Sequence, residues 1–529
     1  MFKRFLVIGL MLGMFLAAGI LMYSLPFPLA SVSLARAQAA SSSELSALWL
    51  LDGAQLVALE PQTGQVLLRV PAYFAFQPTS RDEKWRYIVS TPSQESGYVL
   101  VTQLDLERGS VSKIFELSDS AYQSGSFYRN PITQVATSPD NQRLVMLITA
   151  AYDGRWYTRI GRLVDLATGE SSTHTILLDP LKSINDQVSP QVWTSFNNDG
   201  SQLIVVQNEI GDGSQANWAT KITLSQVNAD VQLGISQETT RDISPQMKSN
   251  GQPVMPILSP DSKTLYLLQF ETANTGKANY HFVAFDLDQM QVIRTQTVES
   301  NQDNEPFCNN DVRLSPDGRY LYSYCYGDIT HRGDHFSFLD TQTGLVTQSV
   351  ALPAEMTAEN PNAFLFQYVV SPDQKQVYLV TFDQKQLHIA VLDVEQQAIV
   401  RSANVDTKDR ALNFTDGLKR LLVNTANAKG GEGFTTSVVI SPDGKRLYFS
   451  ALPYGSLTNL ELLAIDTSSL QVAGHWLKGQ PITGLKLNRD GSELYALSSS
   501  NHTLFVLDAA TGQVLRSFDK VLTSPSFAP

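Results

Sequence analysis

The chain has 529 residues, with 39 basic and 51 acidic side chains and a formal net charge of −12. This balance argues against a nucleic-acid-binding protein, because that affinity depends on clustered Lys and Arg side chains that meet phosphates. The length alone would allow several domains. The repeats described below run without interruption, however, and favour one large domain at residues 45–529.

The first 39 residues have the pattern of a targeting segment. Lys3 and Arg4 precede an uncharged apolar stretch, and Ala37-Gln38-Ala39 is a candidate cleavage site. We therefore expect residues 1–39 to be a signal peptide, or an N-terminal membrane anchor formed by residues 5–24 if the segment is not cleaved. Either alternative predicts an extracytoplasmic protein that is secreted, periplasmic or at the cell surface, and that meets a membrane only through this segment.

A turn of the Ser-Pro-Asp-Gly type recurs between pairs of apolar runs. Proline presets φ at the second position of such a turn, and glycine can take the positive φ that closes a hairpin. The spacing of about 45–70 residues is typical of a repeat architecture. Eight complete or degraded copies begin at Ser80, Ser138, Asn197, Ser259, Ser315, Ser371, Ser441 and Asn488.

A second repeat alternates with the first. It consists of an apolar strand that ends in an acidic residue, a short polar turn and another apolar strand. Each pair of hairpins supplies four short strands, which is the content of one propeller blade. We therefore predict an all-β fold, a single β-propeller of four-stranded antiparallel blades. The nine copies of the second repeat, one of them degraded, centre on Glu60, Asp105, Asp165, Ser225, Asp286, Asp340, Asp393, Asp466 and Asp508.

The two repeats give different blade counts, because the chain opens with three strands that lack a Ser-Pro-Asp hairpin. We expect these strands at 47–51, 55–59 and 65–70. The tail after Val521 could supply the missing strand and close the ring, which would protect the sheet edges. We predict eight blades and leave seven and nine open, since the usual range ends at about eight.

The repeat resembles a known bacterial family. The segment 488–495, followed by 504–508 and 511–514, resembles the YVTN-type propeller repeat, and the segments 315–322 and 441–448 are also similar to the WD40-like repeats of the TolB type. The resemblance implies a propeller fold and an exported setting. The family includes surface-layer proteins and its relatives include lactonases and quinoprotein-like enzymes, but no catalytic motif of those relatives occurs in this chain.

The two cysteines, Cys308 and Cys325, flank the turn that begins at Ser315. In a ribbon folded about Pro316 and Asp317 they would face each other, so we predict a structural disulfide, which an oxidising compartment favours. A bulge in the turn would shift the register and turn the two side chains apart. Two buried free thiols are the alternative.

The predicted ring has two unlike faces. The tight turns of both repeats open on one face, and the longer connections open on the other, which we name the long-loop face. Binding usually resides in variable loops on a rigid scaffold, so we expect the site on this face, with the mouth of the central channel. The longest connections are expected at 116–131, 179–190, 238–253, 299–308, 352–363 and 402–434.

Aromatic side chains beside the polar residues of two other loops are candidate binding residues. Arg155, Trp156 and Tyr157 follow the loop at 152–154, and Trp218 follows the loop that begins at 211–213. Their rings could stack on a sugar or anchor a partner protein. The alternative, which we favour, is that the aromatic residues begin the next strand and pack between blades.

His331 and His335 are the only pair of histidines with carboxylates nearby in the sequence, among them Asp328. Imidazole and carboxylate groups can bind zinc. Histidines four residues apart meet on a helix, whereas this segment is predicted to be a loop that leads into a strand. We therefore favour a solvated loop over a metal site and retain the three residues as binding candidates.

No Gly-x-Ser-x-Gly elbow, His-Glu-x-x-His motif or paired Cys-x-x-Cys motif occurs, and we expect no cofactor. The sequence favours an exported, non-enzymatic propeller that binds a protein, a glycan or another cell-envelope component through the long-loop face. The alternative is an extracytoplasmic enzyme, a lactonase-like hydrolase or a quinoprotein-like enzyme, with a site at the mouth of the central channel.

Overall fold

All residues that the computed structural model describes belong to one compact unit, Glu44–Pro529. The predicted targeting segment at 1–39 lies outside them. The described residues are 47–52, 55–71, 85–90, 98–118, 128–152, 155–168, 176–177, 191–210, 218–227, 235–247, 255–272, 278–298, 307, 312–325, 335–356, 364–382, 386–406, 438–451, 461–498, 502–519 and 525–527.

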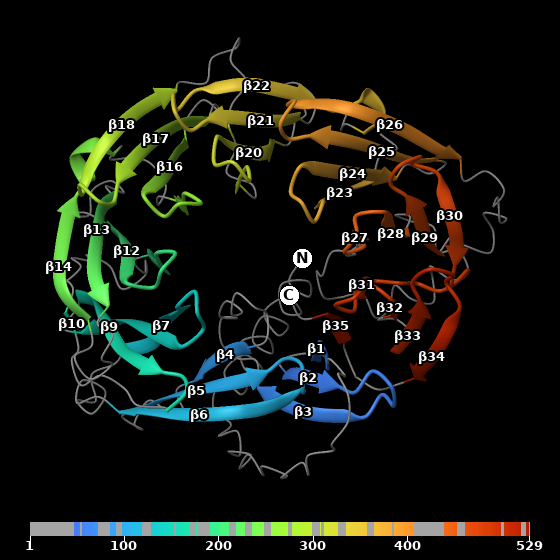
Figure 1. Cartoon of the computed structure of the whole chain (residues 1–529), viewed down its shortest axis with the longest axis horizontal. Helices are drawn as coiled ribbons and strands as arrows, with labels where there is room; N and C mark the ends of the chain where they lie inside the picture. The colour runs from blue at the N-terminus through green and yellow to red at the C-terminus, as the bar shows by residue number, and fades with distance from the viewer. Residues whose placement is uncertain are drawn as a thin grey trace, which may run out of the picture. The chain divides into compact units, whose positions relative to one another are not determined.

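The described residues form nine antiparallel sheets that follow one another around a ring (Figure 1). Each sheet is one blade, and its strands are named inner, second, third and outer from the centre outward. From the inner strand outward, the first three blades are blade 1, with β35 (Pro525–Phe527), β1 (Leu48–Asp52), β2 (Gln55–Leu59) and β3 (Val66–Pro71); blade 2, of which the second, third and outer strands are described, with β4 (Trp85–Ser90), β5 (Tyr98–Asp105) and β6 (Ser110–Ser118); and blade 3, with β7 (Tyr128–Thr137), β8 (Arg143–Tyr152), β9 (Arg155–Asp165) and β10 (Ile176–Leu177).

The next three, in the same order of strands, are blade 4, with β11 (Gln191–Phe196), β12 (Gln202–Ile210), β13 (Trp218–Val227) and β14 (Ile235–Asp242); blade 5, with β15 (Met255–Leu258), β16 (Thr264–Thr272), β17 (Ala278–Asp286) and β18 (Gln291–Val298); and blade 6, with β19 (Arg313–Leu314), β20 (Tyr320–Cys325), β21 (His335–Asp340) and β22 (Val346–Ala351).

The last three are blade 7, with β23 (Phe364–Val370), β24 (Gln376–Phe382), β25 (Gln386–Asp393) and β26 (Ala398–Asp406); blade 8, with β27 (Val438–Ile440), β28 (Arg446–Ala451), β29 (Glu461–Asp466) and β30 (Val472–Trp476); and blade 9, with β31 (Gly484–Leu487), β32 (Glu493–Ser498), β33 (Thr503–Asp508) and β34 (Val514–Asp519).

The all-β prediction of four-stranded antiparallel blades is confirmed, but the count of eight is wrong and the open alternative of nine is right. The three opening strands do not form a partial blade. Their missing inner strand is β35, which pairs with β1 through Leu50↔Phe527, Leu51↔Ser526 and Asp52↔Pro525. Blade 1 therefore joins the two ends of the chain without a covalent turn. This explains why nine acidic turns accompany only eight Ser-Pro-Asp turns.

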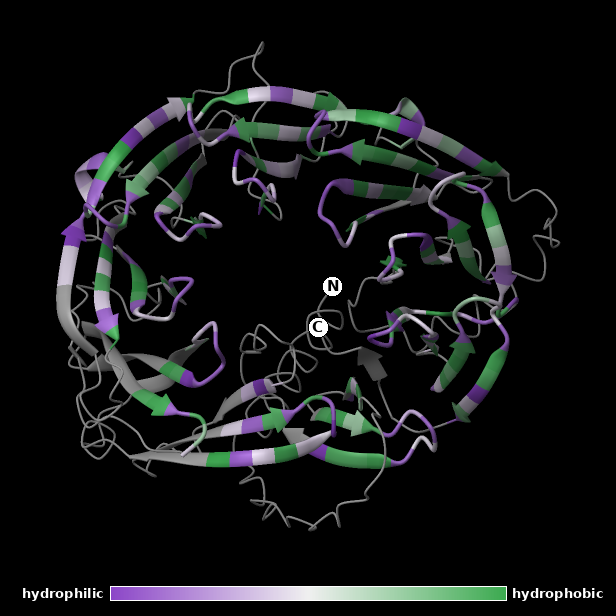
Figure 2. Cartoon of the chain, viewed as in Figure 1, coloured by the Kyte–Doolittle hydropathy of each residue, from purple (hydrophilic) through white to green (hydrophobic). Residues whose placement is uncertain are grey.

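Apolar side chains fill the space between neighbouring blades. Separate buried clusters join blades 3 and 4, 4 and 5, 5 and 6, 6 and 7, 7 and 8, and 8 and 9. The clusters at the two sides of blade 1 include Tyr495 and Leu48 on one side, and Trp49 and Leu104 on the other. The middle strands are accordingly the most apolar, whereas the turns at the inner rim are hydrophilic (Figure 2). Burial between blades, rather than within one sheet, stabilises the ring.

Side-chain donors add a second link between neighbouring blades. Each reaches a backbone carbonyl in the turn that joins the third and outer strands of the next blade. Because these turns would otherwise leave carbonyls without a donor, the links satisfy backbone groups and fix the blade spacing. The bonds are Trp49 Nε1 to Leu106 O at 3.1 Å, Lys113 Nζ to Leu166 O at 2.7 Å, Arg401 Nη1 to Thr467 O at 2.8 Å, Arg446 Nη1 to Ala509 O at 3.2 Å, and Arg516 Nε to Pro61 O at 3.1 Å.

The Ser-Pro-Asp turn is held by its own side chains. In the turn that begins at Ser315, the Ser315 hydroxyl donates to Asp317 Oδ1 at 2.6 Å and accepts the Tyr320 N–H at 2.9 Å. The same bonds recur in the turns at Ser259, Ser371 and Ser441. The fourth residue has positive φ in every described copy, as the sequence predicts for glycine, although three copies carry Asn141, Ser262 or Gln374 there.

Replacing Gln374 by glycine is expected to stabilise the protein. Gln374 has a φ of 60°, a conformation that costs a side-chain-bearing residue about 1–2 kcal/mol and glycine almost nothing. Part of this gain is offset by the greater entropy of glycine in the unfolded chain, so we expect a net gain of about 0.5 kcal/mol in the free energy of unfolding. Urea titration measures it, and Gln374→Ala, which keeps the strain, should show no gain.

The tight turns of both repeats favour the charged form of their aspartates, which predicts how stability depends on pH. Hydrogen bonds from Ser468 and Ser469 lower the pKa of Asp466 to about 2, and bonds from Ser441 lower the pKa of Asp443. A folded pKa below the unfolded value near 3.9 contributes stability that is present above that value and is lost as pH falls through the folded pKa. The thermal midpoint should therefore be flat above about pH 5 and fall between about pH 4 and 2.

Asp466→Asn tests this dependence at one turn. The amide oxygen can still accept the serine hydrogen bonds, but the side chain no longer ionises. The variant should have a lower thermal midpoint than the wild type at pH 7 and the same midpoint at pH 2. An equal difference at both values would contradict a role for the charge.

Candidate functional site

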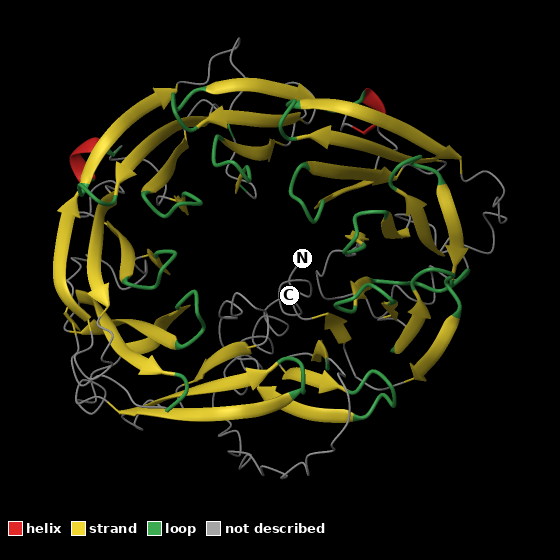
Figure 3. Ribbon diagram, viewed as in Figure 1, coloured by secondary structure: helices red, strands yellow, loops and turns green. Residues whose placement is uncertain are grey.

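The strand directions assign each connection to a face. Neighbouring strands are antiparallel, so the turns after the inner and third strands open on one face, and the connections after the second and outer strands open on the other, the long-loop face. Three connections on this second face are described, wholly or in part, over five residues or more. They contain η2 (Ser244–Gln246), η3 (Ala354–Met356) and the segment 477–483. Both short helices lie at the outer rim (Figure 3).

A buried polar position recurs at the long-loop end of the third strand in blades 4–9. It lies five residues before the residue on which the second repeat of that blade is centred, for example His281 before Asp286. Each of the six side chains is at most 7% exposed. In sheets whose other buried side chains are mainly apolar, a polar group needs a hydrogen-bond partner. The residues are Thr220, His281, His335, His388, Glu461 and Thr503.

Several of these side chains bond within their own blade. His281 Nδ1 lies 2.7 Å from Thr297 Oγ1, His388 Nδ1 lies 2.9 Å from Asn404 Oδ1, and Thr503 Oγ1 donates to Asp519 Oδ1 at 2.9 Å. In blade 8, the buried Glu461 is paired with His475 at 3.2 Å. The polar row therefore ties the third strand to the outer strand around much of the ring.

His281 also links its blade to the preceding connection, because its Nε2 contacts the carbonyl oxygen of Gln246 in η2. The same arrangement of elements recurs two blades later. The segments 243–247 and 352–356 each contain one short helix and end in a buried methionine, whose N–H donates to the carbonyl three residues earlier. His388 and Asn404 in blade 7 correspond to His281 and Thr297 in blade 5.

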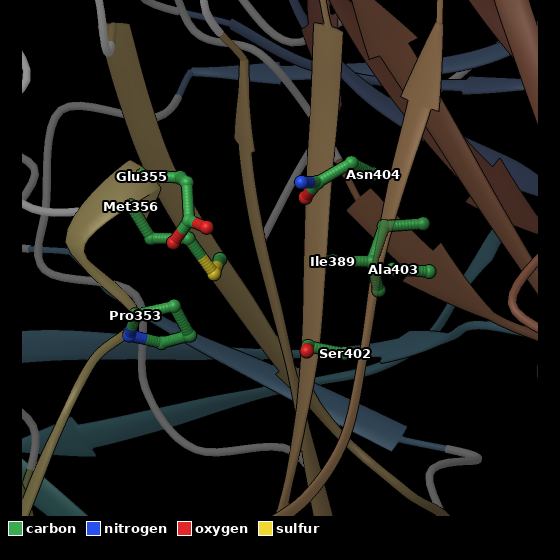
Figure 4. A pocket seen from close by; sticks show the side chains of 7 residues that line it. All are labelled: Pro353, Glu355, Met356, Ile389, Ser402, Ala403 and Asn404. Atoms are coloured by element: carbon green, nitrogen blue, oxygen red, sulfur yellow. The ribbon is translucent and has the colours of Figure 1, made fainter.

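A pocket of about 130 Å³ lies between η3 and the outer strand of blade 7. Figure 4 shows the Glu355 carboxylate and the Asn404 amide on opposite walls, turned toward each other. Asn404 is the residue whose Oδ1 bonds to His388. The pocket thus connects the buried polar row to the surface of the long-loop face. It is lined by Pro353, Glu355, Met356, Ile389, Ser402, Ala403 and Asn404.

The structure places the aromatic candidates at strand ends. Arg155, Trp156 and Tyr157 are the first three residues of β9, and Trp218 is the first residue of β13. These positions agree with the favoured alternative that the aromatic residues begin strands. Both strands start at the long-loop face. The side chains of the four residues lie outside the described part of the chain, so their role in binding stays a prediction.

The histidine loop is described only at its end. Asp328 and His331 lie outside the described residues, whereas His335 begins β21 and is 5% exposed. Sequence reasoning treated His335 as a loop residue and missed that it shares one blade position with His281 and His388. Counting five residues back from each acidic turn residue would have revealed this pattern.

The strand pairing assumed in the disulfide prediction differs by two residues from the pairing that the structure has. A ribbon folded about Pro316 and Asp317 would place Leu314 opposite Arg319, but Leu314 pairs with Leu321, because the turn spans Ser315 to Tyr320. Cys325 is buried beside Ser337, and Cys308 lies outside the described residues. The bond between the cysteines stays a prediction.

Among the described residues, no group of three or more His, Cys, Asp or Glu side chains is close enough to hold a metal ion. In the same part of the chain, no helix has the length and apolar character needed to cross a membrane.

The fold places the chain in a class of protein, the β-propellers. Comparison with solved structures finds the following similar proteins. The dihydro-heme d1 dehydrogenase NirN is 14% identical, with 95% of this chain and 78% of that chain covered and a TM-score of 0.41. AztD from Citrobacter koseri is 10% identical, with 82% and 95% covered and a TM-score of 0.40. Hydrazine synthase from Kuenenia stuttgartiensis is 14% identical, with 71% and 95% covered and a TM-score of 0.30.

No protein-family model matches the chain, and neither does any curated protein. The structural similarities are too low to carry an argument about function. The class therefore rests on the sheet order and on the closure of the ring by β35.

Proposed function

We propose that this chain is an exported, non-enzymatic propeller that binds a protein, a glycan or another component of the cell envelope through its long-loop face. The proposal includes the targeting role of residues 1–39, an extracytoplasmic location and the disulfide between Cys308 and Cys325. The candidate contact residues are Arg155, Trp156, Tyr157, Trp218, Asp328, His331 and His335.

The main support is the way in which the described polar groups of this face are used. His281, His388, Glu461 and Thr503 each bond to a partner in their own blade and are spread over four blades. A catalytic set would instead bring such groups toward one reacting atom. Hydrogen bonds of this kind stiffen the strand ends that carry the connections, which suits a scaffold for binding loops.

The contrast between the two faces is the second support. The tight turns repeat one hydrogen-bond pattern from blade to blade. The connections of the long-loop face differ in length, from the two residues 53–54 or 153–154 to the 31 residues 407–437. Variable connections on a uniform ring are where a partner can be recognised.

Binding to isolated cell envelopes of the producing organism, measured by cosedimentation of the purified chain, tests the proposal. A matched pair of variants separates the faces. Lys478→Glu changes an exposed charge in the connection between β30 and β31, and Lys445→Glu changes an exposed charge in a tight turn. The first should weaken binding and the second should not.

Trp156→Ser and Trp218→Ser extend this test to the aromatic candidates, with the thermal midpoint as a check on folding. Equal loss of binding in both lysine variants would contradict the choice of face. Turnover of a lactone or an oxidisable alcohol by the purified chain would favour the enzyme alternative.

A further inference from the structure

The pocket between η3 and β26 has the donors and acceptors that a sugar ring requires. We propose that it binds a single neutral sugar unit, with neighbouring hydroxyl groups on Glu355 and another hydroxyl on Asn404. The proposal rests on the proposed function and narrows it to the glycan class. At about 130 Å³ the pocket is smaller than the sites of drug-sized ligands and admits one small ring.

Glu355 supplies the acceptors. It is an exposed residue of η3, and its carboxylate forms one wall of the pocket (Figure 4). A carboxylate offers about four lone-pair sites, so it can accept two hydroxyl groups at once while keeping other partners. Hydrogen bonds to a charged acceptor are stronger than those between neutral groups, and this favours a ligand that presents adjacent O–H donors.

Asn404 supplies the donor, and His388 fixes its direction. The amide oxygen of Asn404 lies 2.9 Å from His388 Nδ1. Because an amide oxygen can only accept, Nδ1 carries the proton and the Asn404 amide nitrogen is left to face the pocket. His388 is 3% exposed, so its ring is held by packing. In the tautomer with the proton on Nδ1, the ring bonds to the amide oxygen and not to the amide nitrogen.

The remaining lining favours a hydroxyl group over a charged group. Among the described residues that line the pocket none is Lys or Arg, and the Glu355 carboxylate repels an anion. A cation would use only the carboxylate wall, since the N–H groups of the Asn404 amide do not bind cations. A hydroxyl group both donates and accepts, and it therefore suits both walls. Pro353 and Met356 provide apolar surface for the C–H face of the ring, and Ser402 adds a further hydroxyl.

The chain contains its own comparison. In the related segment 243–247, Gln246 stands where η3 has Glu355, and Thr297 stands where β26 has Asn404. Blade 5 thus has an amide where blade 7 has the Glu355 carboxylate, and a hydroxyl group where blade 7 has the Asn404 amide. The variant Glu355→Gln makes the blade 7 pocket resemble the blade 5 arrangement.

The test is titration of the purified chain with the methyl glycosides of glucose, galactose, mannose and N-acetylglucosamine. Saturation-transfer NMR measures the binding of each glycoside. We expect at least one to bind with a dissociation constant of about 1 mM, as for a ligand of this size. Glu355→Gln and Asn404→Asp should each weaken binding at least about tenfold. Asn404→Asp keeps an oxygen for His388, replaces the N–H donor by an acceptor and adds a negative charge, so the thermal midpoint of this variant is measured as a check on folding.

Glu395→Gln is the matched control, because Glu395 is an exposed carboxylate in a tight turn of the same blade. It should leave the affinity unchanged. Absence of binding by all four glycosides, or unchanged affinity in both pocket variants, would overturn the proposal. Cosedimentation of the same variants with envelopes separates the two ideas: sedimentation without sugar binding overturns the sugar pocket alone, and sugar binding without sedimentation overturns the envelope proposal.

Discussion

Removal of residues 525–529 is expected to open the ring. The deletion takes away β35, the inner strand of blade 1, and leaves one edge of β1 unpaired. Loss of its backbone hydrogen bonds should cost about 2–4 kcal/mol and lower the thermal midpoint by roughly 2–4 °C, since the unfolding entropy of a ring of this size is large. An unpaired edge also recruits other strands, so the truncated chain should self-associate as its concentration rises, which size-exclusion chromatography measures.

The matched control removes only residues 528–529, which follow β35, and should leave both readouts unchanged. A circular permutant provides the converse test. It joins β35 to β1 through a Ser-Pro-Asp-Gly turn and opens the chain in the connection at 407–437. It should remain monomeric and reach at least the wild-type thermal midpoint. If truncation changes neither stability nor association, closure by β35 is wrong.

Replacing Gly512 by alanine should be among the most damaging single substitutions in the described residues. Gly512 has a φ of 74°, and an added Cβ would lie 2.1 Å from ring atoms of Trp476 in the preceding blade. The left-handed backbone costs about 1–2 kcal/mol, and displacement of a packed ring adds about 1–3 kcal/mol. We expect the free energy of unfolding to fall by about 2–5 kcal/mol, measured by urea titration.

Two other glycines separate the cost of positive φ from the cost of a steric clash, because they have the same backbone conformation without a close neighbour. Gly444 has a φ of 72°, but an added Cβ would meet its nearest atom, in Pro372, at 3.7 Å. Gly479 has a φ of 80° with nothing within 4 Å. Gly444→Ala and Gly479→Ala should therefore each cost only about 1–2 kcal/mol. If all three variants lose the same stability, the packing of the acidic turn on the preceding blade contributes little.

Local turn chemistry made most of the fold predictable. The strands expected at 47–51, 55–59 and 65–70 correspond to β1, β2 and β3, and the expected closing tail corresponds to β35. The count of eight is wrong because it follows the usual upper limit of about eight blades. The nine acidic turns and the expected closing tail together indicate the nine blades that the structure has. The register beside Cys325 failed because the Ser315 turn takes in two residues more than a minimal hairpin.

The candidate site was less accessible from the sequence. Residues that line the pocket come from the segment around η3 and from two strands of the next blade. No sequence motif in either segment predicts that the two lie together. The buried polar position was visible in principle, since His281, His335 and His388 stand at one offset from Asp286, Asp340 and Asp393. Its meaning required the burial and the partners, which only the packed blades supply.

The tight-turn face is closely packed, and binding is proposed on the opposite face. The Ser-Pro-Asp turns do more than close hairpins, because they also meet around the inner rim. An added Cβ at Gly318 would lie 2.9 Å from Pro260 of the preceding blade, and one at Gly491 would lie 2.6 Å from Pro442. This close stacking leaves little freedom for the tight-turn face to adapt to a partner. The proposed binding therefore falls to the opposite face.

Hydrogen exchange of the chain, alone and bound to envelope fragments, tests the proposed binding face most directly. We expect peptides that contain η3 and the segment 477–483 to gain protection on binding. Peptides that contain the tight turns at 315–320 and 441–446 should exchange at the same rate in both states. Protection confined to the tight turns, or none on either face, would contradict the proposal.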